Sequence, residues 1–183
     1  NSPYSKENQD VFFRDLLQTP DQLRNELATV KSWVKELGGK KEVEYHIGSF
    51  NTVWWAPEDW TVNSLPVGLW MADMLGTFIE EDIDAAAYWA LMNPFPPGKG
   101  DFGLFSPEMK PYVNFYPFEL YKNHFGKILV KSHSNVKDVS TYASVSNDGK
   151  NLYVMLINKS PNEDKTIEFD LGTFKPRGDA AAW

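Results

Sequence analysis

The residue type best suited to chemistry is a carboxylate, Glu44, within the segment Glu-Val-Glu-Tyr-His-Ile-Gly at positions 42–48. β-Branched and aromatic residues next to glycines predict a short strand over this segment. A charge on a buried strand costs free energy unless it is hydrogen-bonded or used in chemistry. In an eight-stranded α/β barrel, chemistry is carried at the carboxyl ends of the strands. On residue type alone, however, an edge-strand charge or an ion-pair partner is the favoured interpretation of Glu44.

His46 follows Glu44 by two residues, so the two side chains share one face of an extended strand. A hydrogen bond from His46 to a substrate hydroxyl is one interpretation, and a structural histidine is the favoured one. The other histidines, His124 and His133, are too scattered along the chain to suggest a metal site. Cysteine is absent, which excludes disulfides, thiolate metal ligands and a cysteine nucleophile.

Aromatic residues make up 15% of the chain, with 7 Trp, 8 Tyr and 12 Phe. Aromatic rings pack against the C–H faces of sugars and also fill protein cores, so this excess favours glycan binding without deciding it. A loop after the first strand carries Trp54, Trp55 and Trp60, whose alternative role is hydrophobic packing. Trp89, preceded by Tyr88, is a stronger candidate because it lies near the end of the next predicted strand.

The formal net charge of −7 and the absence of a Lys/Arg-rich run leave no electrostatic footprint for nucleic acid or for an anionic membrane. No apolar run is long enough to span a membrane. Neutral or modestly polar partners therefore fit best. The first residues resemble an internal loop without a signal-peptide pattern, and the last residue is apolar. We therefore expect the chain to be a piece of a larger protein.

The first part of the chain alternates helices and strands. Pro20 and an apolar stripe at steps of three and four residues predict a helix over 19–37, ended by Gly38-Gly39. A second helix begins after Ser64, with Pro66 in its first turn. The remaining predictions are strands over 42–48 and 83–92 and a helix over 112–125. Two strand–helix units with buried strands imply a parallel sheet.

After Gly126 the pattern changes to alternating apolar and polar residues separated by turns. It predicts antiparallel strands over 137–143, 152–158 and 165–171, and a hairpin turn at Ser-Asn-Asp-Gly-Lys, residues 146–150. We expect part of a β-sandwich here. The predicted fold class is α/β: residues 1–126 form the last two βα units of a (β/α)8 barrel, and residues 127–183 form a partial antiparallel β-sandwich domain.

Several short motifs support a family resemblance. They are Glu44-Tyr45, Ala87-Tyr88-Trp89, Gly103-Leu104-Phe105 and Lys110-Pro111-Tyr112. In these motifs and in the order of its elements, the chain resembles the last quarter of the clan A glycoside hydrolases, which are retaining enzymes on a (β/α)8 barrel. Within that clan it looks most like the family 44 endoglucanases, and families 51 and 39 are next.

This resemblance implies that Glu44, at the end of the seventh strand, is the nucleophile and that Trp89 forms the floor of the sugar subsite. Tyr45, His46, Tyr88, Trp54, Trp55 and Trp60 are then the expected further substrate contacts. Retaining hydrolysis also needs an acid/base carboxyl group about 5–5.5 Å from the nucleophile. In this clan that residue is a Glu on the fourth strand, and no Asn-Glu on a strand precedes Glu44 here. The chain alone is therefore expected to be inactive.

The resemblance further implies a plant or algal polysaccharide or oligosaccharide as substrate and no metal or organic cofactor. The remaining barrel strands would come from the parent protein or another chain, and a polymeric substrate favours a secreted or periplasmic location. Two alternatives stay open. In a non-catalytic carbohydrate-binding module, the aromatic rings would stack on glycan and Glu44 would only accept hydrogen bonds. In a structural interaction domain, the Trp rings would be buried against one another.

Overall fold

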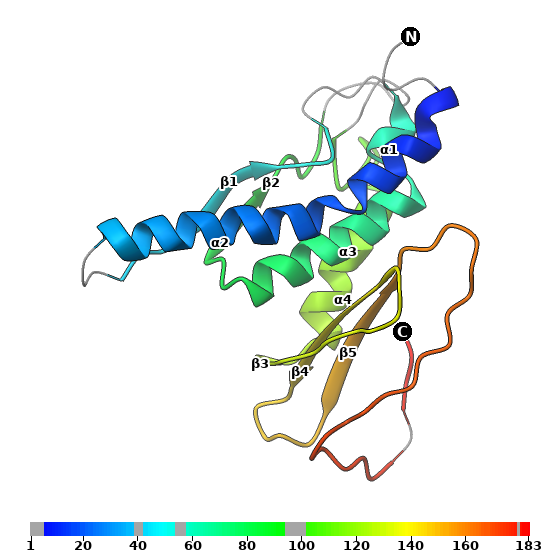
Figure 1. The fold of residues 1–183 in the computed structure, drawn as a ribbon. Coiled ribbons are helices and arrows are strands. Elements are labelled where there is room, and N and C mark those ends of the chain that lie inside the picture. The colour runs from blue at the N-terminus through cyan, green and yellow to red at the C-terminus, as the bar shows by residue number, and fades with distance from the viewer. Residues whose placement is uncertain (1–5, 39–41, 54–57, 94–101, 179) are drawn as a thin grey trace. The chain divides into compact units, whose positions relative to one another are not determined.

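The computed structural model describes residues 6–38, 42–53, 58–93, 102–178 and 180–183 (Figure 1). Its helices are α1 (Gln9–Leu16), α2 (Thr19–Leu37), α3 (Leu65–Glu80) and α4 (Tyr116–His124), with short 3-10 turns η1 (Lys6–Asn8), η2 (Asp59–Thr61) and η3 (Val113–Phe115). Its strands are β1 (His46–Phe50), β2 (Ala85–Tyr88), β3 (Ile128–Val130), β4 (Val139–Val145) and β5 (Leu152–Asn158). The chain divides into two compact units, Asn1–Phe118 and Glu119–Trp183.

In the first unit, β1, α3 and β2 form a strand–helix–strand motif with parallel strands. His46 pairs with Ala85 and Ile47 with Ala86, and a register shift follows before Phe50 pairs with Tyr88. The expectation of a parallel pair joined by an apolar helix is therefore confirmed. Both strands are shorter than the predicted segments 42–48 and 83–92, because each is paired on one side only among the described residues.

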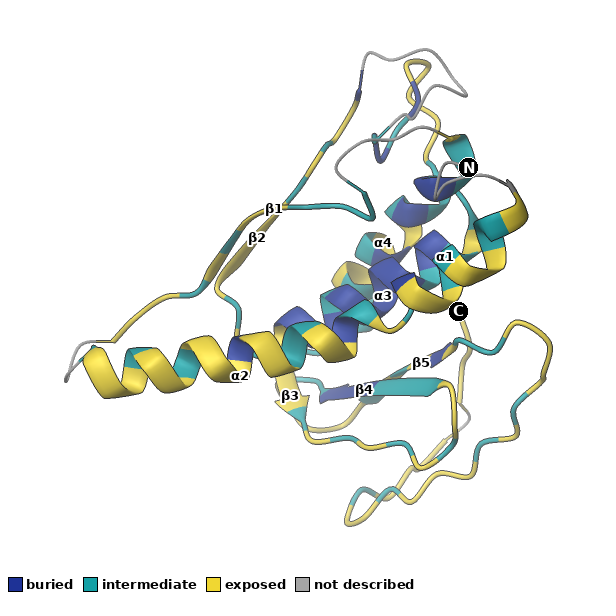
Figure 2. Ribbon diagram, turned by 45° about the horizontal axis from the view of Figure 1, so that its top comes forward, coloured by how far each residue is buried: buried dark blue, intermediate teal, exposed yellow. Residues whose placement is uncertain are grey.

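Helix α3 is the centre of this unit and is buried around most of its circumference, as Figure 2 shows by colour. The core cluster contains Val67, Trp70, Met71, Met74 and Phe78 of α3 together with Leu16 of α1. A helix that is apolar all round must be covered on all sides. Here α1 and α2 pack on it, as do Ile47, Phe50 and Tyr88 of the strands.

Helix α2 covers the full predicted range, and the Thr19 side chain links it to two other helices. Thr19 is the first helical residue, and Gln18 holds the N-cap position. The Thr19 hydroxyl donates to the Leu16 carbonyl oxygen at 2.7 Å and accepts from Trp70 Nε1 at 2.8 Å. Because its hydroxyl is used in these bonds, Thr19 joins α1, α2 and α3 and does not cap a helix.

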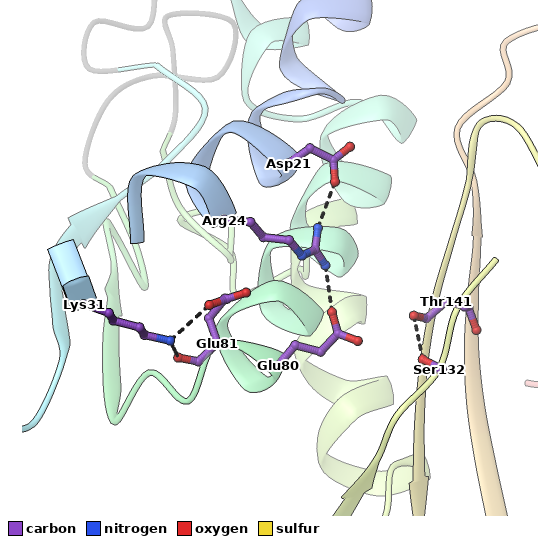
Figure 3. A network of polar contacts seen from close by, with 7 residues as sticks. All are labelled: Asp21, Arg24, Lys31, Glu80, Glu81, Ser132 and Thr141. Carbon is purple, nitrogen blue, oxygen red and sulfur yellow. Dashed lines mark hydrogen bonds and ion pairs between the residues drawn. The ribbon is translucent and has the colours of Figure 1, made fainter. Parts of the chain in front are cut away.

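Ion pairs join α2 to the carboxyl end of α3 (Figure 3). Arg24 lies between Asp21 and Glu80, with both N···O distances 2.9 Å. About two turns further along α2, Lys31 contacts the Glu81 carboxylate at 3.0 Å. These side chains are about one-quarter exposed, apart from Asp21. Charged contacts of this exposure fix the register of two helices more than they stabilise the fold.

The second unit contains an antiparallel sheet in the order β3-β4-β5. Thr141 pairs with Leu156 and Ala143 with Val154, and the predicted turn at 146–150 joins β4 to β5. Ser132 Oγ donates to the Thr141 carbonyl oxygen at 2.9 Å and ties the segment after β3 to β4 (Figure 3).

The predicted strand over 165–171 is wrong, because this segment has no helix or strand structure. Its apolar residues Ile167, Phe169 and Leu171 instead line a cavity of about 840 Å³ whose floor includes Ala143 of β4 and Val154 of β5. Ile167 and Leu171 are half-buried, whereas Phe169 is 50% exposed. An alternating pattern cannot show whether a neighbouring strand is available for pairing.

Candidate functional site

The β1–β2 pair has one face covered by helices and one face open. Ile47 and Phe50 both pack toward α3, because the register shift between them turns the strand by one residue. Tyr88 packs on the same side, 5.5 Å from the Phe50 ring centroid. By alternation, Ala85 and Ala87 lie on the opposite side, which we call the open face. Both alanines are exposed, and Figure 2 shows exposed residues along both strands.

Glu44 lies two residues before β1, so the expectation that it lies within or at the end of a strand is not met. The ladder starts at His46 because β2 starts opposite it, at Ala85. Glu44 Oε2 is 3.2 Å from His46 Nε2, and the two side chains are 75% and 56% exposed. Because Ile47 faces the helices, alternation places His46, and Glu44 beside it, on the open face. The expected pairing of these two residues on one face is observed.

Two of the predicted sugar contacts, Tyr45 and Tyr88, have their rings among protein groups. Lys31 Nζ lies 5.7 Å from the Tyr45 ring centroid. The Tyr45 backbone N–H donates to Asp84 Oδ2 at 2.8 Å. The Tyr88 ring makes edge contacts with Phe50 and Phe118 at the border of the core. Both rings are half-buried, and the Tyr88 ring packs on the helix side of the sheet.

Trp89 lies at the carboxyl end of β2, where its backbone N–H donates to the Phe50 carbonyl oxygen at 3.1 Å and extends the ladder by one residue. Its peptide bond to Ala90 is cis. Since Tyr88 faces the helices, Trp89 falls on the open face, and it is 62% exposed. Among the predicted sugar contacts that the structure describes, the Trp89 indole at the carboxyl end of a parallel strand is an exposed ring available for stacking.

The structure does not bring Glu44 and Trp89 together. Phe50 is the partner of Tyr88, and Glu44 precedes Phe50 by six residues. At roughly 3.3 Å per residue, this separates the two sites by about 20 Å along the strand. The expectation that Trp89 forms the floor beneath the sugar attacked by Glu44 therefore finds no support in this arrangement.

Of the tryptophans in the loop after β1, Trp54 and Trp55 lie outside the described residues. Trp60, in η2, makes edge contacts with Phe12 and Phe13 of α1, with centroid distances of 5.3 and 5.4 Å. These contacts match the packing interpretation of Trp60. They could not be expected from the sequence, because α1 itself was not predicted.

Three amide and hydroxyl side chains at the carboxyl ends of the strands were missed by sequence reasoning. Asn51 follows β1 directly, and its Nδ2 donates to Tyr88 Oη at 3.1 Å. Asn114 of η3 is fully buried, and its Nδ2 contacts the same phenolic oxygen at 2.5 Å. Thr52 Oγ1 donates to the Thr61 carbonyl oxygen at 2.6 Å. An Asn immediately after a strand end was the available signal, and it carries no specific meaning in isolation.

Within the part of the chain that the structure describes, no group of three or more His, Asp or Glu side chains could hold a metal ion. No helix among the same residues is long and apolar enough to cross a membrane.

A parallel strand–helix–strand unit with its exposed aromatic at the carboxyl end is an arrangement typical of α/β enzymes. No protein-family profile and no curated protein matches the chain. Solved structures do match it, and glycoside hydrolases are among them.

Three of these structures show how far the similarity extends. An α-L-arabinofuranosidase from Thermotoga maritima in complex with arabinose matches with a TM-score of 0.64 and 21% identity over 80% of this chain and 35% of that one. A family 51 α-L-arabinofuranosidase from Thermotoga petrophila matches with a TM-score of 0.62 and 22% identity, over 77% and 34% of the two chains. A β-xylosidase from Caulobacter crescentus matches with a TM-score of 0.55 and 17% identity, over 74% and 27%.

At these identities the comparisons show the fold: this chain folds like part of these glycoside hydrolases. It spans about a third of the length of the solved structures that it matches. The broad resemblance to clan A enzymes is thereby supported, and a family 51 enzyme is among the matches. The narrower preference for family 44 receives no support.

Proposed function

We propose that this chain is part of a glycoside hydrolase that acts on a plant polysaccharide, and that the carboxyl ends of β1 and β2 form part of its sugar-binding surface. The observation that carries the proposal is the exposed Trp89 ring on the open face at the end of β2. In (β/α)8 enzymes the substrate lies over this end of the strands. The matched enzymes act on arabinose- and xylose-containing glycosides, so pentose oligosaccharides are the appropriate probes.

The chain also carries the proposed nucleophile of the retaining reaction, Glu44, and a Glu elsewhere in the parent protein would serve as acid and then base. What supports Glu44 is its exposed carboxylate on the open face beside His46. Glu44 precedes β1, at its amino end and about 20 Å from Trp89 along the strand, whereas the substrates of (β/α)8 enzymes lie over the carboxyl ends of the strands. Their roles are therefore tested separately.

The Trp89 proposal is tested by Trp89→Ala in the 183-residue chain, titrated with arabino- and xylo-oligosaccharides. A well-packed stacking contact contributes on the order of 1 kcal/mol, so binding should weaken about five- to tenfold. Trp33 of α2 is a matched control because it is 58% exposed and lies on a helix. Trp33→Ala should leave the affinity unchanged. Equal losses in both variants, or none in Trp89→Ala, would refute the sugar-binding role.

A second candidate is a sugar-binding surface that makes no catalytic contribution. It is favoured by the chemistry at the carboxyl end of β2, where the exposed Trp89 side chain supplies an aromatic ring. Such a ring binds sugars without cleaving them. This candidate predicts that Trp89→Ala abolishes glycan binding while substitution of Glu44 has no effect on any activity of the parent protein.

A further inference from the structure

The Asn51 side chain forms hydrogen bonds that connect three segments of the chain near Trp89. Its Nδ2 donates to the Trp89 carbonyl oxygen, to Tyr88 Oη at 3.1 Å and to the Phe102 carbonyl oxygen at 3.4 Å. Its Oδ1 accepts from the Thr52 backbone N–H at 2.7 Å. A single half-buried amide thus ties the end of β1 to the end of β2 and to the segment that follows at Phe102.

The number of available protons ranks these contacts. An amide nitrogen has two N–H groups, so it makes at most two strong hydrogen bonds. The contacts to the Trp89 carbonyl and to Tyr88 Oη are the shortest, and the contact to Phe102 is the longest. Asn51 therefore acts chiefly on the backbone of Trp89 and on the phenol of the residue before it.

Asn114 contacts the same phenolic oxygen. Its Nδ2 contacts Tyr88 Oη and lies 3.5 Å from the Gly103 carbonyl oxygen, within a fully buried environment. Tyr88 is thus held at its hydroxyl by two amides and along its ring by Phe50 and Phe118. The residue directly before Trp89 has little freedom to move.

From these contacts we propose that Asn51 is the positioning residue of the sugar subsite, which it serves by fixing the Trp89 backbone and thereby the orientation of the exposed indole. The inference rests on the proposed sugar-binding role of Trp89. Both polar atoms of the Asn51 amide are committed to protein groups, so Asn51 acts through Trp89 and does not contact the glycan itself. A ring held in one orientation binds without first being ordered, which strengthens binding.

The test uses Asn51→Asp in the 183-residue chain labelled with 5-fluorotryptophan. Aspartate keeps the acceptor for the Thr52 N–H but cannot donate to the Trp89 carbonyl or to Tyr88 Oη. The fluorine resonance of Trp89, assigned with Trp89→Phe, should shift or broaden, while that of the core residue Trp70 should not change. Affinity for arabino- or xylo-oligosaccharides should fall about tenfold, since small displacements of a positioned group have effects of this size or larger.

Asn25→Asp is the matched control. The Asn25 side-chain amide donates an exposed hydrogen bond to the Asp21 carbonyl oxygen on α2. Its substitution should therefore leave the Trp89 resonance and the glycan affinity unchanged. If Asn51→Asp does not fold, Tyr88→Phe replaces it. Loss of the phenolic oxygen removes one of the two strong Asn51 contacts and should also move the Trp89 resonance.

An unchanged Trp89 resonance in a folded Asn51→Asp or Tyr88→Phe chain overturns the positioning role. This readout needs no glycan. If instead Trp89→Ala leaves glycan binding intact, the proposed sugar-binding function fails, whatever the fluorine spectrum shows. The two failures are therefore distinguishable.

Discussion

Glu44 and His46 meet at 3.2 Å on the open face of the β1–β2 pair, in a segment that the sequence singled out for its chemistry. A carboxylate beside an imidazole can attack, accept a proton or simply form an ion pair. Most exposed ion pairs contribute little to stability. The catalytic role of Glu44 is therefore tested by activity in the parent protein.

The nucleophile assignment predicts the behaviour of Glu44→Gln in the intact enzyme. Glutamine keeps the shape of the side chain but cannot form a glycosyl ester, so turnover should fall by several orders of magnitude. Glu42→Gln, two residues earlier and also exposed, is the matched control and should retain activity. Steady-state hydrolysis of a pentose glycoside provides the measurement. Near-normal turnover by Glu44→Gln would exclude it as nucleophile.

The position of Trp89 at a strand end was predicted from the sequence better than the groups that surround the other site residues were. Trp89 was expected at a strand end and is there, exposed. Tyr88 belonged to the same predicted group, yet its ring faces the core, because neighbouring residues of a strand point to opposite sides. Asn51 and Asn114 were not noticed at all, since they meet at Tyr88 only after the chain has folded.

At the scale of elements, the turn of the β4–β5 hairpin is held by hydrogen bonds to the Asp148 carboxylate. Ser146 Oγ donates to Asp148 Oδ1 at 2.6 Å, and the Lys150 N–H reaches the same oxygen at 3.2 Å. These bonds, with that of Ser146 first, lower the pKa of the Asp148 carboxyl group. The ionised carboxylate therefore stabilises the turn fully above its ordinary pKa, and this contribution is lost as the pH falls through the lowered value.

Ser146→Ala should raise the Asp148 pKa toward its ordinary value, because the strongest of the bonds to the ionised form is removed. An NMR titration of the side-chain carboxyl group measures this directly. Glu163, whose pKa is lowered by Lys165 in a different turn, serves as an internal control and should not change. A Ser146→Ala chain with an unaltered Asp148 titration would contradict the assignment.

Gly126 determines how closely the segment before β3 approaches β4. A Cβ atom added there would lie 2.3 Å from the Val145 carbonyl oxygen, and backbone atoms cannot move aside as a flexible side chain can. Gly126→Ala should therefore lower the free energy of unfolding by about 2–3 kcal/mol, a typical cost of overpacking. Gly178→Ala meets nothing within 4 Å and is the control. Equal urea midpoints for the two variants would rule out the steric explanation.

Elements with long or well-marked patterns were predicted correctly, and those that depend on partners were not. Helix α2 and helix α3 match their predicted ranges closely, because periodicity and proline mark them locally. The short helix α1 and the three-residue strand β3 were missed. Their formation depends on packing and pairing with distant segments, which the local sequence does not encode.

At the scale of the whole molecule, apolar surface is exposed in several places. Helix α2 carries Val30, Trp33 and Leu37 at steps of three and four residues, and these are 40%, 58% and 86% exposed. They form an apolar stripe on one side of the helix. Val43 before β1 and Leu91 after β2 are also exposed, at 41% and 65%. Such surfaces are normally covered in a stable protein.

We therefore predict that the 183-residue chain on its own self-associates and does not cleave glycans. Unpaired strand edges and exposed apolar patches promote association. Light scattering across a concentration series should show a mass that rises with concentration, and pentose glycosides should remain intact. A monomer that folds cooperatively and hydrolyses a glycan would contradict this prediction and would require a second catalytic carboxylate within the chain.

β4 and β5 are close together in the sequence, whereas β1 and β2 are far apart, and this difference affects the order in which the two pairs form. Residues 146–151 alone join β4 to β5, whereas β1 and β2 meet only after the whole of residues 51–84, including α3, has been placed. Hairpins form within about 1–10 μs, and pairings between distant segments are slower because a longer loop must close first. The β4–β5 hairpin should therefore form before the β1–β2 pair. Until β1 and β2 pair, Asn51 and Tyr88 are not brought together.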